Sequence, residues 1–181
     1  MGAGKISTMV VVVFLLSFSM LPDSLQAKYS GGSGEPNDPY QIANTDDLLA
    51  LAVETGDYVK HFLLTADIDL APNLPGGQVF TTAIIAPDTS LNNGFQGTAF
   101  SGTFDGAGHK IINLTINTNG VGNNYLGLFG YLCVDGKIKN LGVENVFITG
   151  GSSHHVGGLV GENLGPVSDW SFNGHCCRKT G

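Results

Sequence analysis

A short pattern of glycine and β-branched apolar residues recurs three times in the second half of the chain. It reads HKIINLTI at 109–116, GKIKNLGV at 136–143 and GPVSDWSF at 165–172. The first two copies align at an offset of 27 residues, and the second and third copies at an offset of 29. Short strands repeated at such intervals, without helices between them, indicate a β-solenoid, in which each repeat buries its apolar side against its neighbours.

In a solenoid, equivalent positions of successive repeats stack into columns. The alignment therefore predicts one interior column of Ile111, Ile138 and Val167, and a second of Leu114, Leu141 and Trp170. A half-repeat upstream of each copy places a large apolar residue two positions after a glycine, which predicts a further set of equivalent residues, Phe104, Phe129 and Val160.

A polar position also recurs, as Asn113, Asn140 and Asp169. Asn and Asp tolerate left-handed backbone and bond to nearby main chain, so they favour turns, and stacked turns can join such side chains into a ladder. The sequence Asn113-Leu114-Thr115 matches a glycosylation sequon. The turn role already explains the asparagine, so we interpret this match as a coincidence.

The N-terminus has the three parts of a secretory signal peptide. Lys5 precedes an apolar run from Met9 to Leu21, and a polar region follows that ends on the small residue Ala27. The run is shorter than the roughly 20 residues that span a bilayer, although an uncleaved anchor is the alternative. Residues 1–27 are thus predicted to be a signal peptide, and the mature chain is predicted to be secreted or displayed at the cell surface, without a membrane span.

The composition narrows the classes of partner. The net charge is −7, and only 13% of the 181 residues are charged. An acidic chain without Lys/Arg clusters argues against binding to nucleic acid or to an anionic membrane. We expect a surface protein or a glycan as the partner, and association of strand edges between copies is a further hazard.

The remaining chain divides by composition. Residues 28–39, rich in Gly and Pro, are predicted to be a linker, and residues 40–98 an N-terminal cap with the first strands. Within the cap, NTDDLLALAVETG predicts a short helix that Thr45 caps and Gly56 ends. Residues 99–174 are predicted to be the repeats, and residues 175–181 a disordered tail.

The segments GLFGYLCVDGKIKNLGVENVFITGG and VGGLVGENLG resemble the GLUG-motif repeats of secreted and surface bacterial proteins, and the region before them resembles the segment that usually precedes such repeats. The resemblance covers roughly Gly31 to Gly165. It implies an all-β fold, a right-handed parallel β-helix, of the kind found in adhesin-like proteins and beside immunoglobulin-cleaving metallopeptidases. It brings no catalytic residues. With the helix as an N-terminal cap and no recognisable cap after Gly165, we expect a solenoid that is truncated at its C-terminus.

Four residues are candidates for chemistry on such a scaffold. Asp67 and Asp69 alternate along a predicted strand and share one face, as calcium ligands or a catalytic carboxylate pair would. Asp105 and His109 flank a glycine turn. Each pair also has a simpler interpretation, as the solvated face of a strand and as an Asp-Gly turn.

Two histidine-containing segments are candidates for metal sites. His154 and His155 are adjacent, and His175 precedes Cys176 and Cys177. Neither segment has a second pair of ligands at a usual spacing, and the chain contains no H-E-x-x-H motif. With Cys133, the cysteines are odd in number, so no disulfide framework is expected. We therefore predict no catalytic, cofactor-binding or metal-binding residues.

These features predict a secreted or cell-surface β-helical module with a structural or adhesive role and without catalytic activity. The alternatives are a polysaccharide lyase or glycoside hydrolase built on the same scaffold, and a non-catalytic fragment of a larger peptidase or adhesin. An enzyme would need Asp67, Asp69, Asp105 and His109 to converge on one face.

Overall fold

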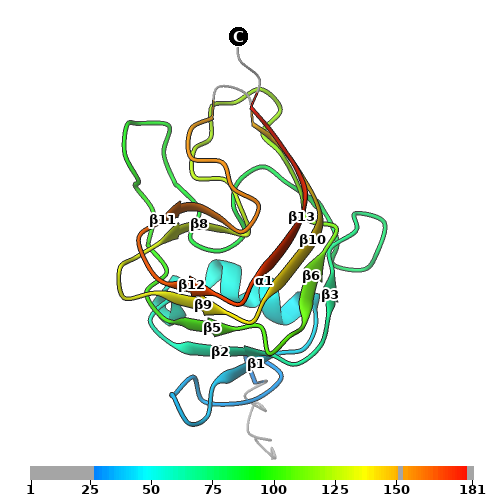
Figure 1. Ribbon diagram of the computed structural model, residues 1–181, viewed down its shortest axis with the longest axis vertical. Coiled ribbons are helices and arrows are strands. Elements are labelled where there is room, and N and C mark those ends of the chain that lie inside the picture. Colours follow the sequence, from blue (N-terminus) through cyan, green and yellow to red (C-terminus); the bar gives the residue numbers. More distant parts are fainter. Residues whose placement is uncertain (1–26, 151–152, 179–181) are drawn as a thin grey trace, which may run out of the picture.

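The computed structural model describes residues 27–150 and 153–178, and within them the chain forms a parallel β-solenoid of about three turns (Figure 1). The fold class predicted from the repeats is confirmed. The predicted signal peptide, apart from Ala27, lies outside the described residues. Among the residues that the structure describes, no helix has the length and apolar character needed to cross a bilayer.

The first sheet contains one strand from each successive turn, in chain order. All of its neighbours pair in parallel, and the strands are β1 (Tyr40–Ile42), β2 (His61–Leu64), β5 (Thr103–Asp105), β9 (Lys137–Lys139) and β12 (Val167–Ser168). Because every strand lies on the strand of the preceding turn, the backbone hydrogen bonds of this face run along the solenoid axis.

The second sheet follows the first around a corner of each turn. Its strands are β3 (Ile68–Asp69), β4 (Val79–Phe80), β6 (Lys110–Ile112), β7 (Thr115–Asn117), β10 (Gly142–Gly150) and β13 (Ser171–Arg178). The long strand β10 pairs with β6 near its start, with β7 near its end, and with β13 on its other side. A third, smaller sheet joins β8 (Phe129–Leu132) to β11 (Val160–Asn163).

The paired residues define the true interior columns. The first sheet stacks Tyr40, Phe62, Phe104, Ile138 and Val167. The second sheet stacks Ile68, Ile111, Val143 and Phe172. The third face stacks Ile85, Phe129 and Val160.

These columns confirm the offset of 29 residues and correct the offset of 27. Ile138 pairs with Val167 as predicted, but Ile111 pairs with Val143 and not with Ile138. The alignment matched strands of different sheets. Lys110–Ile112 belongs to the second sheet, whereas the similar Lys137–Lys139 belongs to the first. Two strands of one turn have the same alternation of apolar and polar residues, so composition alone cannot tell them apart.

The other predicted equivalences are corrected in the same way. Leu114 and Leu141 do not share a column, because Leu114 accepts a hydrogen bond from Phe147 whereas Leu141 lies at a corner between two sheets. Leu141 and Trp170 do hold equivalent positions as predicted, since Gly142 pairs with Ser171, but Trp170, predicted to be interior, is 51% exposed. Phe129 and Val160 are paired as predicted, but Phe104 lies in a different sheet from them.

The interior is aromatic toward the first turns and aliphatic toward the last. Phe62 and Phe104 stack with ring centroids 6.4 Å apart, and Phe104 meets Phe129 edge to face at 5.4 Å. All three rings are almost completely buried. Edge-to-face and offset aromatic pairs of this kind stabilise a core beyond the area that they bury.

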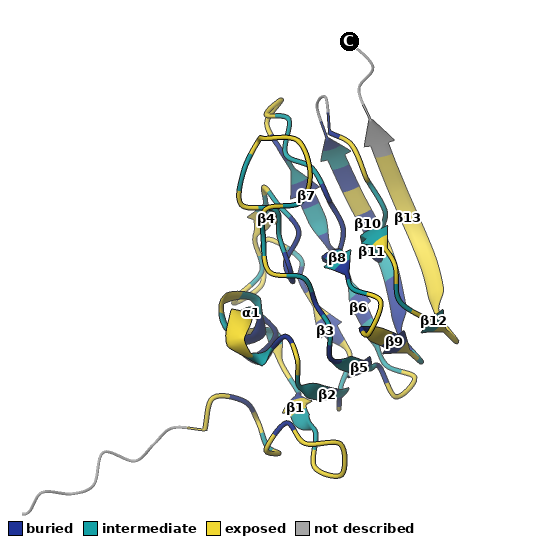
Figure 2. Ribbon diagram, turned by 90° about the vertical axis from the view of Figure 1, so that its left-hand side faces the viewer, coloured by how far each residue is buried: buried dark blue, intermediate teal, exposed yellow. Residues whose placement is uncertain are grey.

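The predicted helix caps the first turn. Helix α1 (Thr45–Val53) is followed by a 3-10 turn, η1 (Thr55–Asp57), and it buries Leu48 and Leu51 in the core. The two views place α1 at the end of the solenoid opposite β13 (Figures 1 and 2). The predicted cap residue is wrong by one position: Asn44, not Thr45, accepts the hydrogen bond from the Asp47 N–H.

Three predicted boundaries differ from the structure. The 28–39 segment is packed and not a free linker, since Tyr29 is buried against Tyr40 and Phe62 and Gly31 pairs with Gln41. No boundary falls at residue 98, because β2 pairs directly with β5. Part of the expected disordered tail belongs to β13, which pairs with β10 through Arg178; residues 179–181 lie outside the described chain.

Candidate functional site

The corner between the first and second sheets is made of three stacked turns. They lie between β5 and β6, between β9 and β10, and between β12 and β13. The backbone is left-handed at Ala107, Asn140 and Asp169, with φ of 51°, 53° and 51°. Asn and Asp adopt this conformation at the lowest cost among residues with side chains, which explains why the repeat places them here.

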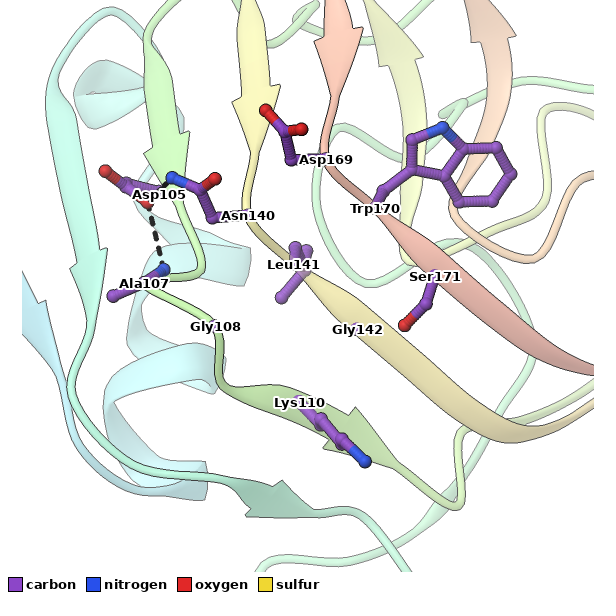
Figure 3. A pocket seen from close by; sticks show the side chains of 10 residues that line it. All are labelled: Asp105, Ala107, Gly108, Lys110, Asn140, Leu141, Gly142, Asp169, Trp170 and Ser171. Carbon is purple, nitrogen blue, oxygen red and sulfur yellow. Dashed lines mark hydrogen bonds between the residues drawn. The ribbon is translucent and has the colours of Figure 1, made fainter.

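A shallow groove of about 550 Å³ follows this corner across all three turns (Figure 3). It is polar at its rim and has glycines and a buried leucine on its floor. Its lining residues are Asp105, Ala107, Gly108, Lys110, Asn140, Leu141, Gly142, Asp169, Trp170 and Ser171.

The lower wall of the groove is a closed network around Asp105. Its carboxylate accepts hydrogen bonds from the Asn140 amide at 3.0 Å and from the Ala107 N–H at 2.9 Å, and it pairs with Lys139 at 2.9 Å. Partial burial raises the pKa of this carboxyl, but the hydrogen bonds from Lys139, Asn140 and Ala107 outweigh burial, so the pKa lies below its ordinary value. Asp105 is therefore an ionised structural acceptor.

The upper wall differs, because its polar groups have no such partners. Within the described part of the chain, the side chains of Asp169, Trp170 and Ser171 make no hydrogen bond and no ion pair. They are consecutive in sequence, and all three line the groove. In Figure 3 the Trp170 indole lies on the opposite side of the chain from the Ser171 hydroxyl, and Trp170 also borders an apolar hollow with Val160, Val167 and Phe172.

A second polar ladder lies along the other end of β6. Asn113 donates a hydrogen bond of 2.6 Å to Asp69 and accepts one from Asn145. Asn113 and Asn145 are both left-handed, with φ of 62° and 52°. The predicted turn role of the polar repeat positions agrees with this geometry, but the single predicted series is wrong: Asn113 belongs to this ladder, whereas Asn140 and Asp169 belong to the corner groove.

The four candidate residues for chemistry do not form one cluster. Asp67 accepts a hydrogen bond of 2.9 Å from the Lys110 N–H and lies 3.2 Å from His109 Nδ1. The Lys110 N–H, with help from His109, holds the pKa of Asp67 below its ordinary value. Asp69 and Asp105 belong to the two separate ladders described above.

The alternation predicted for this strand is nonetheless correct. Asp67 and Asp69 are exposed, and Ile68 between them is buried. Among the described residues, no group of three or more His, Cys, Asp and Glu side chains is placed to hold a metal ion.

The histidine segments have structural contacts. The ring of His155 stacks on Tyr125 at 4.5 Å, and its Nε2 lies 3.1 Å from Glu162. The main chain of His154 is bonded to the side chain of Asn124. His175 lies in β13, where its ring stacks near Phe147 at 6.3 Å.

Sequence reasoning did not single out the upper wall of the groove. It placed Trp170 in the interior because Leu141 occupies the preceding position of the repeat and is buried. The available signal was the residue type, since the chain's one tryptophan follows a turn-forming Asp at a position where the other copies have leucine.

The chain is thus a parallel β-solenoid with a polar groove at one corner. Comparison with known proteins identifies distant relatives. Halomucin of Haloquadratum walsbyi is 32% identical over 155 residues, which are 83% of this chain and 2% of halomucin. A protein of Evansella cellulosilytica, described as a Gly-rich membrane protein, is 30% identical over 165 residues, which are 90% of this chain and 18% of that protein.

The chain therefore spans a small part of each of these much longer relatives. No family model matches the chain. No solved structure matches it either.

Proposed function

We propose that this chain is an extracytoplasmic β-solenoid module of the GLUG-like kind, with a structural or adhesive role and without catalytic activity. One observation carries the proposal: the acidic residues that could have formed an active site are instead bonded between successive turns. Asp69 accepts a hydrogen bond from the Asn113 side chain, and Asp105 accepts one from the Asn140 side chain. Groups used in this way fix the turns and leave no converging acid and base.

The relatives support the location. One is named halomucin and the other is described as a membrane protein, and in both the matching region is a small share of a long chain. A rigid, repetitive unit within long chains suits a spacer or a display element better than a free enzyme. The predicted signal peptide is consistent with export.

The non-catalytic role is tested by incubating the refolded mature chain with polygalacturonate and other acidic glycans, with and without calcium. We expect no new reducing ends and no unsaturated products above a buffer control. Cleavage that disappears in Asp105→Ala but persists in the exposed-site control Asp135→Asn would establish the enzyme alternative instead.

The location is tested separately. Residues 1–27 fused to an alkaline phosphatase that lacks its own signal should give active enzyme outside the cytoplasm of a bacterial host. The same fusion with the apolar run interrupted by Val12→Asp and Leu15→Asp should remain inside and inactive. Equal activity of both fusions would contradict export through this segment.

The partner is a surface protein or a glycan, and copies can also associate through β13. In the described chain this strand pairs with β10 on one side, and its residues 171–176 are exposed (Figure 2). An exposed edge strand favours pairing with another strand. Sedimentation over a range of concentrations should show reversible self-association that Asn173→Pro weakens; a monomer at all concentrations would contradict it.

A further inference from the structure

A pocket of about 260 Å³, separate from the corner groove, lies between two connections that are far apart in sequence. One connection is 81–102, between β4 and β5, and the other is 118–128, between β7 and β8. Six of the seven lining residues carry a side-chain oxygen. The lining is Thr82, Asp88, Thr89, Ser90, Leu91, Asn123 and Asn124.

Both connections are held in place by contacts outside the pocket. The ring of Phe95 stacks on Tyr131 with centroids 4.5 Å apart, and it meets Tyr125 edge to face at 5.3 Å. The side-chain amide of Asn123 donates a 2.9 Å hydrogen bond to the Thr81 carbonyl, which joins the two connections. The pocket is therefore built into the fold, and a ligand would not have to order either connection first.

The polar side chains of the pocket mainly offer acceptors, because their donors are used on the main chain. The Thr89 hydroxyl donates to the Gln96 carbonyl at 2.9 Å, and the Thr82 hydroxyl donates to the carbonyl of the next residue at 3.2 Å. The amide of Asn123 is used in the same way, so its Oδ1 is left to accept. An oxygen whose donor is committed elsewhere presents only lone pairs to a ligand.

Asp88 adds a carboxylate that the surrounding residues do not balance. Its Oδ1 accepts a hydrogen bond from the Gln96 N–H at 2.9 Å, whereas its Oδ2 is buried and accepts none from the described residues. No Lys, Arg or His side chain is among the described residues that line the pocket. A buried carboxylate oxygen without a donor or a cation is costly, so this oxygen favours a bound cation.

The type of oxygen selects the cation. Ca²⁺ takes about six to eight ligands from carboxylate, carbonyl, amide and water oxygens in a flexible geometry, whereas Mg²⁺ demands a near-ideal octahedron. Zn²⁺ prefers the nitrogen and sulfur atoms that this pocket lacks. A site with one carboxylate binds Ca²⁺ weakly, with a Kd of about 0.1–1 mM, as is typical of extracellular modules.

From these observations we propose that the pocket binds one calcium ion, with Asp88 Oδ2 as its charged ligand and the oxygens of Ser90 and Asn123 among its neutral ligands. Water completes the coordination, and the ion joins the two connections. The sequence did not indicate this site, because one carboxylate and neutral oxygens from two separate connections form no local motif. The inference goes beyond the proposed structural or adhesive role and does not depend on it.

Calcium titration of the mature chain, first treated with a chelator, tests the proposal. Calorimetry should show one saturable site in the range given above, and calcium at about ten times the Kd should raise the melting temperature by a few degrees. The same concentration of Mg²⁺ should raise it much less. Absence of saturable binding, or an equal shift with Mg²⁺, would overturn the proposal.

Asp88→Asn then locates the ion. It removes the charge but keeps an acceptor for the Gln96 N–H, so it should weaken calcium binding at least about tenfold without lowering the melting temperature in the absence of calcium. Asp135→Asn is the matched control, because it removes an exposed carboxylate outside the pocket and should keep the calcium shift. A calcium shift that survives in Asp88→Asn would overturn the proposal.

Ser90→Asp provides a gain of affinity that a misfolded variant cannot imitate. It adds a second carboxylate to the lining and keeps an acceptor for the Asn92 N–H, which Ser90 Oγ binds at 3.2 Å. Calcium should then bind at least about threefold more tightly, since affinity rises with the number of charged ligands. Unchanged affinity would overturn the proposal. Glycans that stay intact in the presence of bound calcium would leave the non-catalytic role as proposed.

Discussion

The side-chain amide of Asn140 donates a 3.0 Å hydrogen bond to the carboxylate of Asp105, one turn earlier in the solenoid. Residues 35 positions apart in sequence are thereby joined at the corner, in addition to the backbone ladder between β5 and β9. The contact explains why polar residues recur in a repeat that is otherwise apolar: they satisfy one another across turns whose backbone alone would be strained.

Two substitutions of Asn113 separate the cost of its left-handed backbone from the contribution of its side-chain hydrogen bonds. Asn113→Gly keeps the left-handed backbone accessible and loses only the bonds to Asp69 and Asn145, so it should lower the unfolding free energy by about 1–2 kcal/mol. Asn113→Ala adds the left-handed strain and should cost about 1 kcal/mol more. Urea unfolding measures both.

Asn119 is the matched control for this pair, because it is also left-handed, with φ of 53°, but is exposed. Asn119→Ala should lower the unfolding free energy through the strain of the left-handed backbone, and Asn119→Gly should leave that free energy nearly unchanged. If Asn113→Gly is as neutral as Asn119→Gly, the ladder contributes nothing to stability.

Asp105 should make stability depend on pH in the acid range. Its pKa is lower in the folded chain than in the unfolded chain, so its stabilisation is complete above the unfolded value of about 3.9 and is lost as the pH falls through the folded value. Asp105→Asn should therefore melt below the wild type at pH 6, and the difference should shrink toward pH 2.5. Asp135→Asn, which changes an exposed carboxyl, is the control variant; a difference for Asp105→Asn that stays constant with pH would refute the linkage.

The aromatic interior should carry much of the stability. Phe104 is completely buried and contacts both Phe62 and Phe129, so Phe104→Ala should cost about 3–5 kcal/mol through lost burial and the cavity left behind. Leu91→Ala removes a side chain that is 64% exposed and should stay within about 0.5 kcal/mol of the wild type. Similar losses for the two variants in chemical denaturation would show that the interior is not packed in this way.

Tyr58 joins the cap to the first turns through its hydroxyl group. The group donates to the Ala52 carbonyl at 2.9 Å and accepts from the Ala86 N–H at 3.1 Å, inside the core. Tyr58→Phe leaves the ring in place but removes the acceptor of Ala86, so it should cost about 1–3 kcal/mol. Hydrogen exchange should quicken at the Ala86 amide in this variant, whereas unchanged exchange would mean that another group protects it.

The architecture could be predicted from the sequence because the apolar spacing is strict where loops are short. Ile138 and Val167 were paired correctly, since only 27 residues separate β9 from β12 and the motif is intact in both turns. The register of Ile111 was wrong because each turn contains two short strands with the same alternation, and the longer loops of the earlier turns hide which strand is which.

The candidate site could not be predicted in the same way. Repeat alignment assigns a residue by the average behaviour of its column, and Leu141 in the preceding turn is buried. Trp170 holds the same position of the repeat on the last described turn, where its indole is 51% exposed. Whether a side chain at such a position is buried depends on contacts between turns, and the local sequence pattern does not predict those contacts.

The order of strands in the first sheet, β1-β2-β5-β9-β12, is also their order along the chain, and the helical cap and most of the aromatic side chains lie at its beginning. A nascent chain emerging from the ribosome would therefore complete its closed base first. Each later turn would arrive on a surface that is already formed, so that assembly can proceed in the direction of synthesis, one layer at a time.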